Sequence, residues 1–347
     1  MKIALDAMGG DHAPEVTVEG AIDTIKEYPD IEIILVGDAS RIEKELQNKK
    51  KYPKERLSIK HASEVIAMDE SPSYALRRKK DSSIKRAVEL HKDGMAEAVV
   101  SAGHSGVAMA TALFILGKAP GVDRPAIAVS LPTLKKPFVL IDAGANVDCK
   151  PSNILEFAYM GTAYYRTVFS VEKPRIALLS IGEEDTKGNE LTKDAFKLLR
   201  NSGLNFKGNI EGKDLFIGEA DVIVCDGFIG NVVLKLSEGL AEVIMKMLKR
   251  EISDISTGRL AYLLMKPALK RFKKKTDYAE YGGAPLLGIN GTCIISHGRS
   301  SAKAIKNAIV VAANLAKAGL HRTISQELSK IKKSISIDVP VLNGVPS

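Results

Sequence analysis

Amide, lysine and histidine side chains recur in glycine-rich loops that directly follow four apolar runs of the chain. These loops read SAGHSG at 101–106, DAGAN at 142–146, IGEEDTKGNE at 181–190 and DGFIGN at 226–231. Glycines let backbone N–H groups turn towards an anion, and helix N-termini add a favourable dipole. Lysine supplies a point charge, whereas histidine and asparagine supply oriented donors. The pattern therefore predicts a site that binds phosphate and can stabilise an oxyanion during acyl transfer.

In an open α/β sheet, ligands bind where the carboxyl ends of parallel strands meet the loops that follow. The expected catalytic residues are Lys187, Asn231, His104 and Asn146. The expected phosphate- or substrate-binding residues are Gly103, Ser105, Gly106, Gly182, Gly188, Asp226 and His297. A solvated loop lysine at 187, and capping or core histidines at 104 and 297, are the alternatives.

Several common site motifs are absent. The chain has neither the GxGxxG pattern of dinucleotide sites nor the GxxxxGK[ST] pattern of nucleotide sites. GHSG at 103–106 lacks the GxSxG spacing of a nucleophile elbow, so Ser105 is a weak nucleophile candidate. DAMGGDHAP at 6–14 is more consistent with loop structure than with metal ligation, and no HExxH or paired Cys/His spacing occurs. We therefore expect no metal and no cofactor.

Composition narrows the class of protein. Of the 347 residues, 45% are hydrophobic and 27% are charged, which is typical of a globular protein. Aromatic residues make up only 5% and tryptophan is absent, which argues against a base-stacking surface for nucleic acid. Asp6 interrupts the apolar run that a signal peptide would need, and no stretch of 18 apolar residues occurs. The dispersed Cys149, Cys225 and Cys293 indicate reduced thiols, so we expect a cytoplasmic protein.

Strand-like and helix-like segments alternate along the chain. Strands are expected at 2–6, 31–38, 57–62, 98–100, 126–132, 138–144, 176–180, 222–227 and 291–300. Helices are expected at 16–28, 40–49, 82–93, 106–118, 153–169, 191–201 and 301–319. This alternation predicts a three-layer αβα fold with a mostly parallel sheet. The strands at 126–132 and 138–144 are close enough to predict an antiparallel hairpin.

One segment interrupts this alternation. Residues 239–277 show helical apolar spacing in two arms, which predicts a helical hairpin inserted after the Asn231 loop into a single catalytic domain at 1–333. Between 246 and 275 there are ten basic and two acidic residues, and this difference of eight equals the whole formal net charge of +8. Pairing of two such hairpins into a four-helix bundle predicts a homodimer. Residues 334–347 are expected to form a tail.

Six motifs together resemble the bacterial phosphate acyltransferase family of phospholipid synthesis. The resemblance extends from Met1 to about Ile331. The motifs are MKIALDAMGGDHAP (1–14), SAGHSGVAMA (101–110), LIDAGANVDCKP (140–151), LLSIGEEDTKGNE (178–190), CDGFIGNVVLK (225–235) and EYGGAPLLGINGTCIISHGRS (280–300). The resemblance implies a fold similar to phosphotransacetylase and to the isocitrate/isopropylmalate dehydrogenase group. It also implies synthesis of acyl phosphate from acyl-acyl carrier protein and inorganic phosphate.

The resemblance further implies a homodimer at the inner face of the cell membrane, supplying an integral-membrane glycerol-phosphate acyltransferase. For this chemistry we expect Lys187 and His104 to hold phosphate, and Asn231 and Asn146 to polarise the thioester oxygen. A phosphotransacetylase that uses acyl-CoA thioesters is the alternative, followed by a non-enzymatic acyl- or phosphate-binding protein.

The basic hairpin has two candidate partners, acidic acyl carrier protein and an anionic membrane surface. The residues expected to contact the membrane are Leu260, Leu263, Leu264, Phe272, Lys273 and Lys274.

Overall fold

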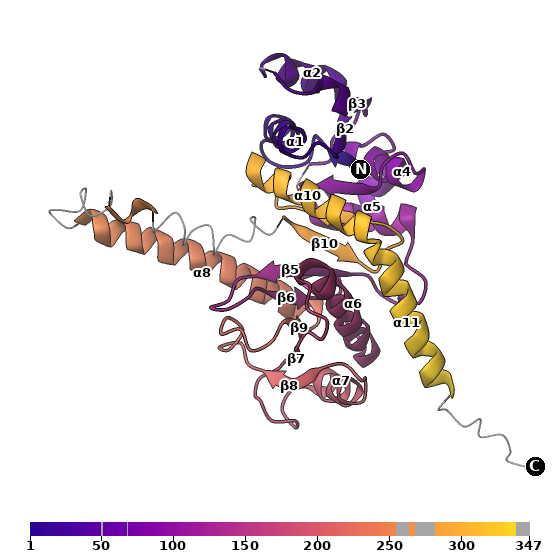
Figure 1. Cartoon of the computed structure of the whole chain (residues 1–347), viewed down its shortest axis with the longest axis vertical. Coiled ribbons are helices and arrows are strands. Elements are labelled where there is room, and N and C mark those ends of the chain that lie inside the picture. The colour runs from indigo at the N-terminus through magenta and orange to yellow at the C-terminus, as the bar shows by residue number, and fades with distance from the viewer. Residues whose placement is uncertain (50, 68, 255–263, 268–281, 338–347) are drawn as a thin grey trace, which may run out of the picture.

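A single eleven-stranded sheet organises the molecule, in the order β3-β2-β1-β4-β11-β10-β5-β6-β9-β7-β8 (Figure 1). The computed structural model describes residues 1–49, 51–67, 69–254, 264–267 and 282–337. Helices cover both faces of the sheet, as the sequence predicts.

The sheet consists of two parallel blocks joined by two strands. The first block contains β1 (Lys2–Asp6), β2 (Glu32–Gly37), β3 (Leu57–His61), β4 (Ala98–Ser101) and β11 (Cys293–Ile295). The second block contains β6 (Phe138–Ile141), β7 (Ile176–Leu179), β8 (Phe206–Ile210) and β9 (Val222–Val224). Between them lie β10 (Ala284–Leu287) and β5 (Ala126–Leu131). β10 is antiparallel to β11 and β5, and β5 is antiparallel to β6, so the two blocks run in opposite directions.

In the described part of the chain, ten α-helices connect these strands or extend from them. They are α1 (Glu15–Glu27), α2 (Ala39–Gln47), α3 (Pro72–Arg78), α4 (Ser83–Lys92), α5 (Ser105–Leu116), α6 (Pro151–Phe169), α7 (Glu190–Arg200), α8 (Gly227–Asp254), α10 (Ala302–Ala318) and α11 (Leu320–Ile337). A 3-10 turn, η1 (Lys54–Arg56), precedes β3.

Alternation along the buried strands creates the layers. In β1, Ile3 and Leu5 belong to one core cluster, whereas Ala4 belongs to the cluster on the opposite face. The first of these faces is closed by α1 and α10, which meet at Gly20. A Cβ on Gly20 would lie 2.7 Å from the carbonyl oxygen of Ala302, so only glycine permits this helix contact.

The predicted alternation of elements is largely observed. Every expected strand and helix from residue 2 to 201 has a counterpart, and β5 and β6 form the expected antiparallel hairpin. The sequence pattern missed α3, β8, β10 and α11. In α11 the pattern was interrupted at Gly319, whose left-handed φ of 63° redirects the chain between α10 and α11. The helix then continues to Ile337, four residues into the predicted tail.

The predicted hairpin differs from the observed α8. The helix begins at Gly227 and runs without a break to Asp254, so Asn231 lies in its first turn and not in a loop. Figure 1 shows α8 extending away from the sheet. In the expected second arm, residues 264–267 are helical. Leu260, Leu263, Phe272, Lys273 and Lys274 lie outside the described residues, so their predicted membrane contact stays a prediction.

Candidate active site

The carboxylate of Asp142 organises the loop that follows β6. Asp142 is fully buried and accepts hydrogen bonds from the backbone N–H groups of Ile127, Gly144, Ala145 and Asn146, at 2.7–3.1 Å. Burial raises the pKa of Asp142, and these hydrogen bonds oppose that rise. The loop is therefore held from within by one acceptor group that has many donors.

Asn146 belongs to this internal network. Its side-chain nitrogen donates to Oδ2 of Asp142 at 2.9 Å and to the carbonyl oxygen of Pro125 at 2.7 Å. An amide nitrogen has two hydrogens, so both donors are occupied. Asn146 is also buried. The expectation that its amide polarises a thioester oxygen is therefore contradicted by its hydrogen bonds, which give it a role in holding the loop.

The first turn of α8 packs directly on the Asp142 loop. Gly227 donates its N–H to the carbonyl oxygen of Asn146 at 2.7 Å. A Cβ on Gly230 would lie 1.8 Å from the carbonyl oxygen of Asp142, which excludes any side chain there. Asp226 accepts a hydrogen bond from N of Ile229 at 2.9 Å, as an N-cap residue does. Asp226 thus acts as the N-cap of the helix, with one of its two carboxylate oxygens used in the cap.

Asn231 follows on the same turn and is exposed. A Cβ on Gly144 would lie 3.7 Å from its Oδ1, which places the amide beside the Asp142 loop. Within the described residues its side chain makes no hydrogen bond, so its N–H groups remain available. Of the two asparagines that the sequence selected, only Asn231 can donate to a ligand.

Lys187 lies in the loop between β7 and α7, and its side chain is exposed. Its stem covers Gly182, since a Cβ on that residue would lie 2.8 Å from Cγ of Lys187. Gly188 has a φ of 109°, and a Cβ there would also meet Oγ1 of Thr192 at 2.0 Å. Among the described residues the ammonium group has no ion pair. The glycines therefore shape the loop, and the lysine carries its charge.

Asn189 ends this loop as the N-cap of α7, where its Oδ1 accepts from N of Thr192 at 2.9 Å. β7 and β9 are neighbouring parallel strands. The Lys187 loop and the first turn of α8 therefore leave the sheet at the same edge.

In the first block, His104 is the N-cap of α5. Its Nδ1 accepts a hydrogen bond from N of Val107 at 3.3 Å, so the capping alternative is observed. Because Nδ1 is the acceptor, the neutral ring carries its proton on Nε2, which can donate to a ligand. Ser105 and Gly106 occupy the first turn of α5, where backbone N–H groups have no intrahelical partner. Gly103 differs, because its N–H donates to Oγ of Ser101 at 3.1 Å.

A small cavity adjoins the His104 loop. It measures about 10 Å³, room for about one water molecule, and His104, Ser101, Ser83 and Asp6 line it. Asp6 is buried and accepts from Oγ of Ser101 at 2.7 Å. Burial raises the pKa of Asp6, while hydrogen bonds from Ser83 and Ser101 lower it. The Asp6 carboxylate faces this cavity, whereas the Asp142 carboxylate faces the loop that follows β6.

His297 follows β11, the strand next to β4. Its Nδ1 accepts from N of Arg299 at 3.1 Å. The following Gly298 accepts at its carbonyl oxygen from N of Asp11 at 2.8 Å. The loops after β1, β4 and β11 therefore meet at one edge, with His297 and His104 on it.

The predicted site residues thus form two groups. One group, around Gly103, His104 and His297, follows strands of the first block, and the other, around Lys187 and Asn231, follows strands of the second block. The sequence pattern predicts that these loops lie along one edge, but the blocks run in opposite directions and their carboxyl ends belong to opposite edges. The two antiparallel pairs of β10 cancel each other, so the reversal comes from the antiparallel β5–β6 pair, the hairpin that the sequence predicted.

Sequence reasoning missed the two buried carboxylates as organising groups. Asp6 and Asp142 both occur directly at the end of an apolar strand and before a loop with glycine, in LDAMGG and IDAGA. That shared position was the available signal, because a carboxylate at a buried strand end needs loop N–H groups as partners.

The three cysteines are unsuited to nucleophilic catalysis. Burial raises the pKa of the Cys149 thiol to about 11 and that of Cys293 to about 12. The pKa of Cys225 is also raised by burial. A reactive cysteine needs a lowered thiol pKa, so these side chains have packing roles.

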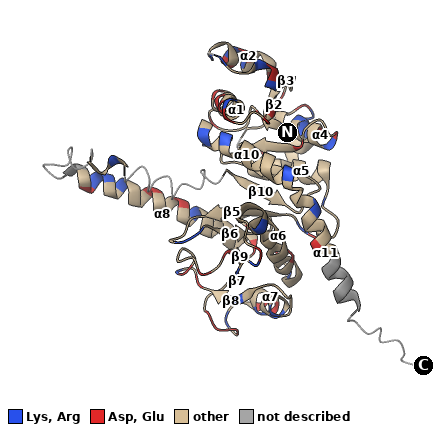
Figure 2. Ribbon diagram, in the orientation of Figure 1, with Lys and Arg blue, Asp and Glu red and all other residues tan. Residues whose placement is uncertain are grey.

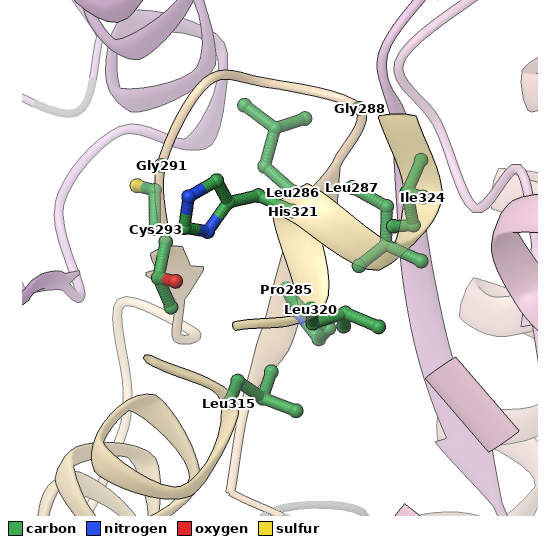
Figure 3. Close-up of a pocket in the computed structure, with 11 residues that line it drawn as sticks. Pro285, Leu286, Leu287, Gly288, Gly291, Cys293, Leu315, Leu320, His321 and Ile324 are labelled. Carbon is green, nitrogen blue, oxygen red and sulfur yellow. The ribbon is translucent and has the colours of Figure 1, made fainter. Parts of the chain in front are cut away.

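A second cavity of about 10 Å³ lies beneath α11, between β10, β11 and α10 (Figure 3). Its lining is mostly aliphatic, with the His321 ring and the Cys293 side chain at one end. His91 lies nearby, donates from Nδ1 to the carbonyl oxygen of Ala96 and accepts at Nε2 from N of Thr292. His91 therefore links α4 to the segment that leads into β11. The cavity has too few donors for an anion site.

Comparison with known proteins identifies the family. A family model described as "Fatty acid synthesis protein" matches residues 1–323. A phosphate acyltransferase of Thermodesulfovibrio yellowstonii is 60% identical over 333 residues, which cover 96% of either protein. This chain belongs to the phosphate acyltransferase family. A phosphate acyltransferase of Geobacter sulfurreducens is 52% identical over 94% of each chain, and the predicted family and acyltransferase class are confirmed.

Solved structures relate the fold of this phosphate acyltransferase family member to other enzymes. A phosphotransacetylase from Streptococcus pyogenes superposes with a TM-score of 0.63 at 20% identity, covering 92% of this chain and 94% of that one. A 4-hydroxythreonine-4-phosphate dehydrogenase from Klebsiella pneumoniae gives 0.51 at 14% identity, covering 91% and 98%. At such identities the likeness concerns the fold alone. It confirms the predicted phosphotransacetylase-like α/β fold.

Proposed function

We propose that this enzyme transfers a fatty acyl group from acyl carrier protein to inorganic phosphate, for phospholipid synthesis. A phosphate oxygen attacks the thioester carbonyl carbon, the C–O bond forms and the C–S bond breaks. The electron pair leaves with sulfur, and the thiolate takes a proton from water. The products are acyl phosphate and the free carrier thiol, and no redox cofactor or metal is needed.

Family membership makes the chain an acyltransferase, and its relatives are named for acyl transfer to phosphate. The description of the family model places this activity in fatty acid synthesis. The acyl carrier protein as donor is our proposal. It is supported by this metabolic setting, in which acyl groups are carried on that protein.

We place the reaction between the two blocks of the sheet. Neighbouring strands rotate by about 20° because of the normal twist. β4 and β9 are five steps apart in the sheet order, so their directions rotate by roughly 100° relative to a flat sheet. A twist of about 100° reduces the angle between the two antiparallel blocks, so that the loops at their carboxyl ends can approach the same ligand. In this arrangement Lys187 and Nε2–H of His104 hold phosphate, with the free N–H groups of Ser105 and Gly106.

Asn231 donates its amide N–H groups to the thioester oxygen and stabilises the negative charge that develops there. The exposed amide and its fixed place on the first turn of α8 support this role. Asn146 and Asp142 act as positioning residues, because they hold the loop on which that turn rests.

A phosphate-dependent thiol-release assay tests the proposal. Thiol release from acyl-acyl carrier protein, together with hydroxamate-trapped acyl phosphate, is expected. The alternative, transfer from acyl-CoA, is favoured by the phosphotransacetylase fold and would give faster release from acyl-CoA. Absence of release from both thioesters would contradict acyl transfer.

We also propose a homodimer formed through α8. One face of this helix exposes apolar side chains at helical spacing, and pairing with a second copy would bury them. The residues on this face are Phe228, Val232, Leu236, Leu240, Val243 and Met247. The flanks carry both charge signs (Figure 2), with ion pairs between Lys235 and Glu238 and between Glu242 and Lys246. Such mixed flanks suit a protein partner better than an anionic lipid surface.

Contact with the inner face of the cell membrane is a further part of this proposal. Leu264 is 76% exposed and Met265 is 41% exposed beside Lys266, a combination that suits an interfacial segment. Within the described ranges, none of the helices combines the length and the apolar run that a membrane span requires. Peripheral contact would release acyl phosphate near the membrane acyltransferase that consumes it.

A further inference from the structure

The helix α3 places a cluster of basic residues on the first block. Between Arg77 and Arg86 the chain has six basic residues and one acidic residue, Asp81. α3 packs on α5 close to its first turn, since a Cβ on Gly106 would lie 3.3 Å from Cγ of Pro72. The cluster therefore lies beside a loop that the proposed reaction uses.

Only part of this charge is neutralised. Lys85 and Arg86 pair with Glu89 at 3.7 and 2.9 Å, and Lys79 pairs with Glu70. Three basic side chains of the cluster remain. They are exposed and have no ion pair in the part of the chain that the structure describes, and they are Arg77, Arg78 and Lys80. We call these three side chains the α3 basic patch.

The segments on either side of α3 form a wall of the His104 cavity. Ile66 precedes the helix and Ser83 follows it, and both line that cavity together with Ser101 and Asp6. A partner bound to the α3 basic patch would therefore sit at the rim of the His104 loop.

We propose that the α3 basic patch docks an acidic carrier protein that brings the acyl thioester. The inference rests on the proposed function, because it names the surface that recognises the donor. Three unpaired cations complement an acidic partner and accelerate its encounter. Tyr74, on the same helix and 56% exposed, adds an aromatic contact of the kind enriched at interfaces. The patch lacks the continuous apolar face that insertion into a bilayer needs.

The test is the triple variant R77E/R78E/K80E in the full-length enzyme. We expect its KM for acyl-acyl carrier protein to rise about 10-fold or more at low salt, because steering is lost. The kcat and the KM for phosphate should stay within about twofold, since the patch binds the donor and does not touch the reacting atoms. Added salt should raise the carrier KM of the wild type and change that of the variant little.

A matched control reverses three exposed lysines elsewhere in the first block, K44E/K54E/K60E, with the same change in net charge. The inference would be overturned by an unchanged KM for the carrier protein in the α3 variant or by an equal rise of that KM in the control variant. Loss of vesicle binding without a change in KM would also overturn it. The proposed function fails differently, by absence of thiol release in the wild type. Equal thermal unfolding of both variants shows that folding is intact.

Discussion

Oδ2 of Asp142 accepts a hydrogen bond from the side-chain amide of Asn146 at 2.9 Å, within a loop whose backbone N–H groups point at the same carboxylate. This pair explains why a strand-end aspartate precedes DAGAN. The carboxylate and amide fold the loop into a platform, and the first turn of α8 rests on it. The position of Asn231 therefore depends on groups that need not contact substrate.

The Asp142→Ala variant should lose stability. Removing the carboxylate leaves several buried N–H groups without an acceptor, which costs roughly 3–5 kcal/mol for a buried charged partner. Urea unfolding, followed by circular dichroism, measures the change. A free energy of unfolding within about 1 kcal/mol of the wild-type value would show that water replaces the carboxylate at little cost.

Gly230→Ala and Gly239→Ala should have opposite effects on the same helix. At Gly230 the new methyl group would meet the carbonyl oxygen of Asp142 at 1.8 Å, so α8 must move away from the loop. At Gly239 nothing lies within 4 Å, and alanine should stabilise the helix interior by about 0.5–1 kcal/mol. Thermal unfolding and kcat of both variants test this. Equal behaviour of the two would contradict the tight packing.

The Asn231→Ala variant should lower kcat by about 100-fold to 1,000-fold, the usual cost of one oxyanion donor. Its Tm should stay close to wild type because the side chain is exposed. Lys235→Ala, one turn further along α8, is the control and should leave kcat unchanged. A normal kcat for the Asn231 variant would remove this amide from the mechanism.

Acidity should affect stability through Asp6. Burial raises its pKa in the folded protein, so the folded state holds its proton to higher pH than the unfolded state does. Its stabilising contribution is therefore complete below the unfolded pKa of 3.8 and is lost as the pH rises through the folded pKa. The Asp6→Asn variant should show a smaller decrease in the free energy of unfolding between about pH 4 and about pH 7, as measured by urea unfolding. Parallel pH profiles of the two proteins would contradict the raised pKa.

The sequence predicted the elements better than their arrangement. Apolar runs and caps define β1 or α7 locally, because Ile3 and Leu5 are buried and Asn189 caps its own helix. The reversed direction of the second block follows from the predicted β5–β6 hairpin, but the position of β5 in the sheet depends on β10, a four-residue strand with Pro285 that carries no alternation. Its pairing with β11 and β5 is a long-range property that local spacing does not encode.

The candidate site shows the same division. Exposure distinguishes Asn231 from Asn146, yet both follow a strand and a glycine in the sequence. Only the contact between Asn146 and Asp142 reveals that one amide is used internally. Similarly, the cap made by His104 fixes which ring nitrogen can donate, and residue type alone does not.

Replacement of Lys187 tests the phosphate half of the mechanism. Lys187→Ala removes the positive charge proposed to hold phosphate, and we expect kcat/KM for phosphate to fall by about 100-fold or more, since charged anchors are worth several kcal/mol in the transition state. The Tm should stay close to wild type, because the side chain is exposed and has no ion pair among the described residues. Lys187→Arg keeps the charge and should retain part of the activity.

Lys193→Ala, on α7 just beyond the loop, is the matched control. Undiminished turnover in Lys187→Ala would assign phosphate binding to the His104 loop alone, whereas a large loss of Tm would show that the lysine stem over Gly182 holds the loop together.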